Sequence, residues 1–144
     1  IRRRYPLAVY EDALRRLKEA GLTVITHVIL GLPGETREDM LETIKYLTKG
    51  IKDTRTDGIK LQLLHVLRNT DLAEDYLAGH FSVMTLEEYL PLLVDMVVHR
   101  ITGDGPKSLL LAPLWTGNKR QVLNAITRYF KEEHVQQGEL FPAD

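Results

Sequence analysis

The chain has 144 residues, of which 44% are hydrophobic and 27% are charged, and this composition indicates one globular α/β-sized domain or a large piece of one. A formal net charge of −1 gives no reason to expect nucleic acid or an anionic membrane as an obligatory partner. Because cysteine is absent, this chain alone cannot form a disulfide, a thiolate zinc site or a Cys-ligated iron–sulfur cluster.

Neither a membrane span nor a secretion signal is visible. No apolar run approaches the roughly 20 residues of a transmembrane helix, so we expect a cytoplasmic protein with no membrane partner. The chain begins at Ile1 and continues through Arg2–Arg4 without start-like character, which predicts a fragment or a trimmed domain.

A helix is predicted over residues 6–20, with Gly21 as its stop. Its inward positions recur at helical spacing and are Val9, Ala13, Leu14 and Leu17. Residues 25–30 follow with four aliphatics and no charge, which is typical of a strand in a parallel sheet that is covered on both faces.

The stretch after this strand is the one around which the chain is arranged. The two glycines of Gly31–Gly34 can adopt positive φ, so the segment predicts a tight turn. Thr36 and Asp39 have the spacing of a capping box, and a helix is expected over residues 37–49. The order is strand, turn and helix, with the turn at the carboxyl end of a parallel strand, where α/β sheets and barrels place ligands.

A second strand is predicted over residues 59–66, and it alternates for part of its length. Ile59, Leu61 and Leu63 share one side, and Lys60 and Gln62 share the other. In a barrel the polar side would face a partly solvated lumen. An edge strand with one wet face explains the pattern equally well, so both interpretations stay open here.

The rest of the chain continues the alternation of helices and strands. A short helix is expected over residues 71–77, a helix from 86 to about 100, a short buried strand over 108–113, a last helix to about 133, and a flexible tail over 136–144. Thr85 with Glu88 forms a second capping box, and Thr116 or Asn118 caps the last helix. Pro91 predicts a kink or a later helix start.

This order implies right-handed parallel crossovers. The fold class is therefore α/β, and because three strands cannot close a barrel, residues 1–135 are expected to form a partial barrel or half of one. The segment Gly31–Glu35 has neither the Walker A pattern nor the glycine spacing of a dinucleotide fingerprint. Since it opens a helix, an anion site and a plain βα turn both remain open.

Polar residues near the strand ends are the candidate site residues. If its side of the first strand faces the lumen, His27 joins Lys60 and Gln62 in one polar cavity. A metal site made of His27, Glu35 and His65 is conceivable, because each lies near a strand end. A lone histidine on a strand is, however, more often a hydrogen-bonded core residue than a ligand.

One family resemblance sharpens these expectations. The stretch Ile29–Thr36, with Glu38-Asp39-Met40 after it, resembles the fifth strand and turn of radical S-adenosylmethionine (SAM) enzymes. The likeness continues through residues 59–72, 101–106 and 111–115, and these later segments are most similar to a YhcC-like Fe–S oxidoreductase subfamily. That subfamily is related to elongator-type and coproporphyrinogen-dehydrogenase enzymes.

The resemblance implies a TIM-like partial (β/α)6 barrel with parallel strands and crossover helices, of which this chain would supply the second half. It also implies SAM and a 4Fe-4S cluster that cleaves SAM to a 5′-deoxyadenosyl radical. The cluster ligands lie in a CxxxCxxC motif that this chain lacks, so we expect the chain alone to be inactive. The family's GxIxGxxE pattern places Ile29 and Gly31 against the adenine, whereas His27 stands where the first Gly would be and Glu35 fits the last position poorly.

Backbone at Leu64, His65 and Val66 would contact the adenine edge by the same resemblance. The substrate is left open, and tRNA or another RNA enters by family analogy alone. Two other readings compete with this one: a non-catalytic α/β binding module, and a metal-dependent barrel hydrolase that uses His27, Glu35 and His65.

Overall fold

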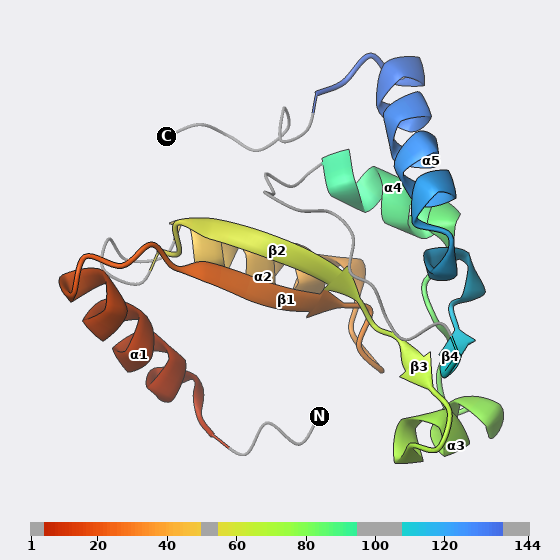
Figure 1. Ribbon diagram of the computed structural model, residues 1–144, viewed down its shortest axis with the longest axis horizontal. Coiled ribbons are helices and arrows are strands. Elements are labelled where there is room, and N and C mark those ends of the chain that lie inside the picture. Colours follow the sequence, from red (N-terminus) through yellow and green to blue (C-terminus); the bar gives the residue numbers. More distant parts are fainter. Residues whose placement is uncertain (1–4, 50–54, 95–107, 137–144) are drawn as a thin grey trace.

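The computed structural model describes residues 5–49, 55–94 and 108–136. Helices and strands alternate along most of the chain (Figure 1). In chain order they are α1 (Leu7–Glu19), β1 (Ile25–Leu30), α2 (Arg37–Lys49), β2 (Gly58–Leu63), β3 (Val66–Leu67), α3 (Asp71–Leu77), α4 (Leu86–Val94), β4 (Leu110–Ala112), the 3₁₀ helix η1 (Leu114–Gly117) and α5 (Lys119–Glu132).

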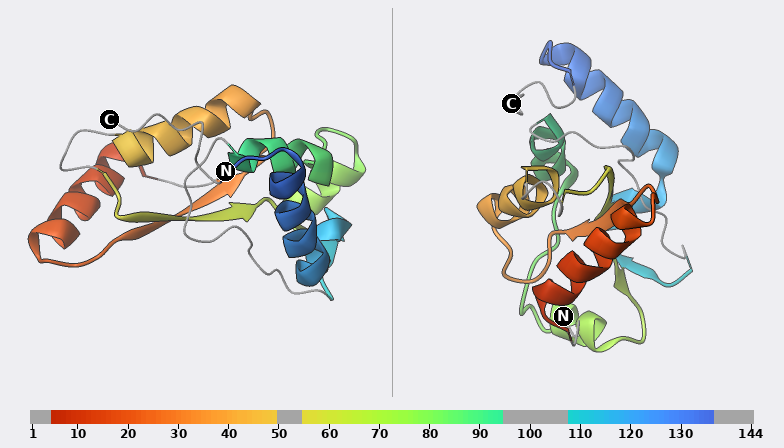
Figure 2. Two further views of the ribbon diagram at one scale, coloured as in Figure 1. Left: turned by 90° about the horizontal axis from the view of Figure 1, so that it is seen from above. Right: turned by 90° about the vertical axis from the view of Figure 1, so that its left-hand side faces the viewer.

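A parallel pair of strands forms the centre of the fold. β1 and β2 pair in a register that sets Ile25 opposite Gly58 and Leu30 opposite Leu63. Helix α2 connects them and lies over one face of the pair, as the view from above shows (Figure 2). The predicted parallel βαβ unit is therefore confirmed, and with it the α/β class.

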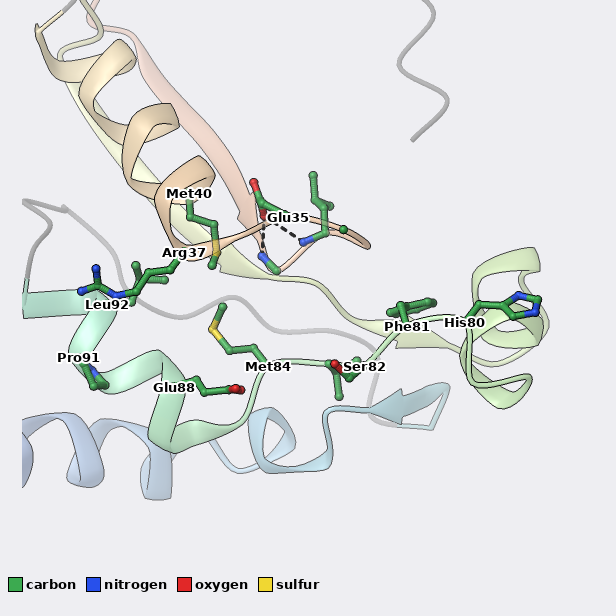
Figure 3. Close-up of a pocket in the computed structure, with 14 residues that line it drawn as sticks. Glu35, Arg37, Met40, His80, Phe81, Ser82, Met84, Glu88, Pro91 and Leu92 are labelled. Carbon is green, nitrogen blue, oxygen red and sulfur yellow. Dashed lines mark hydrogen bonds between the residues drawn. The ribbon is translucent and has the colours of Figure 1, made fainter.

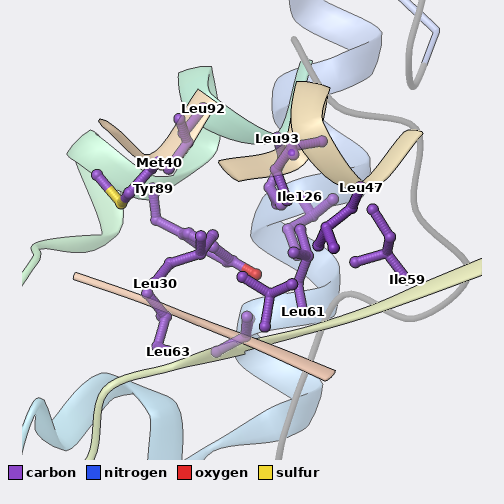
Figure 4. Close-up of a cluster of buried hydrophobic side chains, with 13 residues drawn as sticks. Leu30, Met40, Leu47, Ile59, Leu61, Leu63, Tyr89, Leu92, Leu93 and Ile126 are labelled. Atoms are coloured by element: carbon purple, nitrogen blue, oxygen red, sulfur yellow. The ribbon is translucent and has the colours of Figure 1, made fainter. Parts of the chain in front are cut away.

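The face of the strands toward α2 carries the main hydrophobic core. Side chains of even number on β1 and of odd number on β2 point into it, where they meet α2, α4 and α5 (Figure 4). The buried members are Val28, Leu30, Met40, Ile44, Leu47, Ile59, Leu61, Leu63, Tyr89, Leu92, Leu93, Val122 and Ile126. Burying this many apolar side chains is the main source of stability for the unit.

The opposite face of the pair is open to solvent. Ile25 and Ile29 on β1 are 43% and 44% exposed, and His27 between them is exposed too. The sequence led us to expect a strand over residues 25–30 that is covered on both faces, and this is wrong within the described chain, because only one side of β1 is buried. Composition did not reveal this, since the exposed positions are themselves mostly aliphatic.

The third predicted strand differs from expectation in its direction. β4 was expected to join the sheet as a parallel strand, but it pairs antiparallel with β3, and Val66 lies opposite Ala112. The chain leaves β2 after Leu63, and β3 forms a separate small sheet with its own apolar cluster beside α3 (Figure 1). A three-residue strand carries too little pattern to indicate its partner.

Helix ends follow the expected chemistry. Gly21, at φ 75°, ends α1 while Leu22 donates its N–H to the Leu17 carbonyl, which is a Schellman-type stop. Thr85 and Glu88 exchange reciprocal bonds at the start of α4, so this capping box is confirmed. Of the two candidates for α5, the cap is Asn118, whose Oδ1 accepts from the Gln121 N–H at 3.2 Å.

Some predicted details are wrong or lie outside the described residues. Within α1 only Leu14 is buried, whereas Val9 and Leu17 are 49% and 41% exposed rather than inward. α4 begins at Leu86 with Pro91 inside it, so the later start expected from the proline does not occur. The expected extension of that helix over residues 95–100 and the tail over 137–144 fall outside the described residues.

Helix α1 is anchored to the amino ends of the strands by polar contacts. Asp57 accepts from the Val24 N–H at 2.9 Å and pairs with Lys18 Nζ at 3.0 Å. The Tyr10 hydroxyl bonds Thr26, which donates to the buried Thr56. The Val24 N–H, and after it Lys18, hold the pKa of Asp57 below its usual value.

These contacts give a pH-dependent stability. A carboxylate whose pKa is lowered by folding stabilises the fold above its unfolded pKa of about 3.9 and loses that effect as pH falls through the folded value. We expect Asp57→Asn to unfold at lower urea concentration than the wild type at pH 7, with the difference shrinking below about pH 4. The control is Glu74→Gln, an exposed acid on α3. A difference that stays constant from pH 7 to pH 3 would contradict the assignment.

Candidate functional site

The turn that links β1 to α2 is held by the carboxylate of Glu35 (Figure 3). Its Oε2 accepts from the backbone N–H of Gly31 at 2.8 Å and from that of Leu32 at 3.0 Å. Gly31 and Gly34 have φ values of 76° and 80°, which L side chains rarely adopt. The tight, glycine-dependent turn predicted from the sequence is thus confirmed, and the structure adds the contact of Glu35 with its backbone.

The hydrogen bonds of Glu35 help to decide between the two interpretations of this turn, an anion site and a plain βα turn. The two N–H groups at the bend already have an anionic partner in Glu35, so they have no need of an external one. At the start of α2, Asp39 accepts from the Thr36 N–H and hydroxyl, and the backbone bond in particular lowers the pKa of Asp39. The predicted Thr36–Asp39 capping box is confirmed, and the geometry favours a plain βα turn over an anion site.

Three of the residues expected on the adenine side lie together at the carboxyl ends of the strands. The Leu64 N–H donates to the Leu30 carbonyl at 2.9 Å, which places Leu64 beside the bend at Gly31. Ile29 projects from the open face, opposite Gln62. The three residues therefore lie at the carboxyl end of the parallel pair, although the Leu64 N–H is already used in a backbone hydrogen bond.

The other two residues of that set differ from each other. His65 is partly buried and follows directly after Leu64. Val66 is fully buried in the smaller cluster of β3, β4 and α3, so its side chain faces away from any ligand on the open face. Only its backbone is a candidate for contact.

The residues expected to line a polar cavity share the open face. His27 lies directly opposite Lys60, and Gln62 is the next residue on the same side of β2. All three are exposed or half-buried. The register therefore brings the predicted set together on the side of the sheet that a barrel turns toward its lumen.

The metal-site alternative has a different outcome. Among the described residues there is no group of three His, Cys, Asp or Glu side chains placed to hold a metal ion. His27, Glu35 and His65 are thus not brought together as a ligand set. Glu35 instead accepts from two backbone N–H groups within its own turn.

A cleft of about 730 Å³ lies next to the same bend, toward α4, and sequence reasoning missed the segment that forms its far wall. This wall is residues 80–84, between α3 and α4 (Figure 3). The Met84 Cε lies 3.6 Å from where a Cβ on Gly31 would stand, and Trp115 Nε1 donates to the Met84 carbonyl at 3.2 Å. No local signal predicts these contacts, because they join residues far apart in the chain.

Family comparison identifies this architecture. A profile described as the radical SAM C-terminal domain matches residues 56–132, and the radical SAM superfamily profile matches residues 1–47. The chain belongs to the radical SAM superfamily. The first match ends at residue 47, near the end of α2, and the second begins at residue 56, just before β2, so the parallel pair draws one strand from each matched segment.

Curated relatives agree with this membership. The chain is 36% identical over 149 aligned positions to YtqA of Bacillus subtilis and 32% identical over 144 to YhcC of Escherichia coli K12, covering 98% and 94% of this radical SAM chain. It spans 45% of the length of each of those proteins. A shorter match, 43% over 49 residues, covers 33% of the chain and 11% of the B. subtilis threonylcarbamoyladenosine tRNA methylthiotransferase MtaB.

A solved structure has the same fold. The Elp3 protein of Methanocaldococcus infernus superimposes with a TM-score of 0.69 at 20% identity, covering 92% of this radical SAM chain and 32% of that one. The likeness shows that the two chains share an α/β fold over this region. In the part of the chain that the structure describes, no helix is both long and apolar enough to cross a bilayer.

The contact of Glu35 with its turn can be tested through stability. Glu35→Ala leaves two N–H groups without their acceptor, and we expect the free energy of unfolding to fall by about 1–3 kcal/mol, with faster amide exchange at Gly31 and Leu32. Glu35→Gln keeps an acceptor oxygen and should lose less. Glu38→Ala, an exposed acid on α2, is the control and should change stability by no more than about 0.5 kcal/mol. Equal losses of stability for Glu35→Ala and Glu38→Ala would contradict a stabilising role of Glu35 in the turn.

Proposed function

We propose that this chain is the C-terminal half of a radical SAM catalytic domain, and that the complete domain cleaves SAM reductively. The observation that carries the proposal is the shared edge at which Ile29, Gly31 and Leu64 meet, beside an open face with His27 and Lys60. A flat apolar contact next to an exposed polar surface suits a nucleoside that is held close to a polar substrate.

The free edge of β1 is consistent with a missing half. Within the described residues β1 pairs with β2 alone. A groove of about 750 Å³ between α1 and α2 runs beside β1, and its lining includes Leu7, Tyr10 and Tyr46. In the proposed domain, the strands of the first half would continue the sheet from this edge.

The residues of this chain fit SAM better than they fit a 4Fe-4S cluster. With no cysteine in the sequence, no thiolate of this chain can hold a 4Fe-4S cluster, so the cluster would depend wholly on the other half of the domain. For SAM the fit is better, because Ile29 offers an exposed apolar surface and Gly31 allows a bend that other residues would strain. When bound together, the two groups supply the radical chemistry, and this chain supplies binding and orientation.

In this proposal one set of residues contacts SAM and a second set contacts the substrate. Ile29 and the backbone at Gly31, Leu64, His65 and Val66 contact the adenine side of SAM. His27, Lys60 and Gln62 line the substrate side, where Lys60 would attract an anionic group of the substrate. We propose RNA as the substrate class, which is supported by the tRNA-directed name of the MtaB relative rather than by any motif here.

The first test measures SAM cleavage by the complete protein, reconstituted without oxygen, as 5′-deoxyadenosine released. Ile29→Asn should raise the SAM Kd at least about tenfold, because it places an amide where an apolar contact is needed. Ile25→Asn is a matched control on the same open face with the same exposure, four residues toward the amino end. Absence of cleavage in the cluster-loaded protein, or equal losses from both variants, would contradict the proposal.

The second test separates the substrate side from the SAM side. Lys60→Gln removes the cation of the open face without touching the proposed adenine contacts. We expect 5′-deoxyadenosine release in the absence of substrate to stay within about twofold of wild type, whereas substrate turnover falls about tenfold or more. A parallel loss of both activities would place Lys60 on the SAM side instead.

A further inference from the structure

A polar groove lies far along the chain from the parallel pair, between the start of α4 and one side of α5. It has a volume of about 360 Å³ and is lined by Leu86 and by a row of residues along one side of α5, which begins with its N-cap. The row consists of Asn118, Arg120, Gln121, Asn124, Ala125 and Arg128. In Figure 1 the green helix α4 lies beside the blue helix α5, and the two helices are in contact.

The arginine side chains of this row make few interactions with the rest of the protein. Among the described residues, the side chains of Arg120 and Asn124 have no hydrogen-bond or ion-pair partner. Arg128 meets Glu132 at 3.8 Å, with the two side chains 75% and 63% exposed, and such a pair contributes little. The Glu88 carboxylate in the first turn of α4 accepts from the Thr85 N–H rather than from either arginine.

The rest of α5 limits what the row could bind. Its apolar stripe, with Val122 and Ile126, is buried in the core and is not free to enter a bilayer. An amphipathic membrane helix needs an exposed apolar face beside its basic one. Leu123, at 43% exposed, is a single apolar side chain beside the row and does not make a continuous apolar face. The row therefore presents mainly guanidinium and amide groups, which suits a hydrated polyanion.

We propose that this groove binds the sugar–phosphate backbone of an RNA. Arg120 and Arg128 are eight residues apart, or about 12 Å along the helix, so they would meet different phosphates of a strand that carries a charge about every 3.4 Å. The amides of Gln121 and Asn124 between them can both donate and accept, as contact with a ribose 2′-hydroxyl requires. This proposal deepens the proposed function, on which its choice of RNA rests.

The test is binding of a fluorescein-labelled, mixed-sequence single-stranded RNA by the 144-residue chain, followed by anisotropy over a series of salt concentrations. The double variant Arg120→Ala/Arg128→Ala should lower the affinity about tenfold or more at low salt and reduce the slope of log K against log salt by about 0.7 for each arginine. Asn124→Asp, which places a negative charge between the arginines, should also weaken binding.

A matched control is Arg16→Ala on α1, an exposed arginine 3.7 Å from Asp12, which should change the affinity by less than about twofold. DNA of the same sequence should bind more weakly than RNA. The proposal is overturned if the chain binds no RNA, or if it binds DNA as tightly as RNA. It is also overturned if the double variant and the control lose the same amount of affinity, or if the chain binds phosphatidylserine vesicles instead of RNA. SAM cleavage without substrate is measured separately, and the double variant should leave it unchanged, so failure here and failure of the proposed function are distinguishable.

Discussion

Two hydrogen bonds from the backbone to the Glu35 carboxylate fix the turn between β1 and α2, and the positions of the other elements depend on this turn. They turn the chain by a fixed amount at the end of β1, so that α2 returns along the sheet and β2 enters parallel to β1. The resulting register sets Ile29 opposite Gln62 and brings Leu64 alongside the bend. Without this bend, neither the apolar core on one face nor the polar residues on the other would hold their positions.

The two faces of the parallel pair have different roles. The face toward α2 is closed by a core that reaches α4 and α5, and this core fixes the strands (Figure 4). The other face keeps His27 and Lys60 accessible beside two exposed isoleucines. Apolar and polar side chains therefore alternate along β1 on this face, beside Lys60 and Gln62 of β2, and the apolar ones form no continuous patch.

Local pattern predicted what depends on neighbouring residues. The β1–α2 turn, the capping boxes at Thr36 and Thr85, and the shared side of Lys60 and Gln62 all follow from short-range spacing and were correct. The antiparallel pairing of β4 and the wall containing Met84 were not predictable, since each depends on contacts between distant segments. The hydrogen bonds by which Glu35 stabilises its own turn were not predicted either, because the sequence suggested Glu35 only as a conceivable metal ligand near a strand end.

We propose that SAM lies against the carboxyl ends of β1 and β2. Amide hydrogen exchange of the complete, cluster-loaded protein with and without SAM tests it most directly, because the readout is residue-specific and requires no turnover. If SAM binds there, its addition should slow exchange over residues 29–32 and 64–66 and leave residues 110–112 almost unchanged. Protection confined to the cleft wall at residues 80–84, or absent from 29–32, would contradict it.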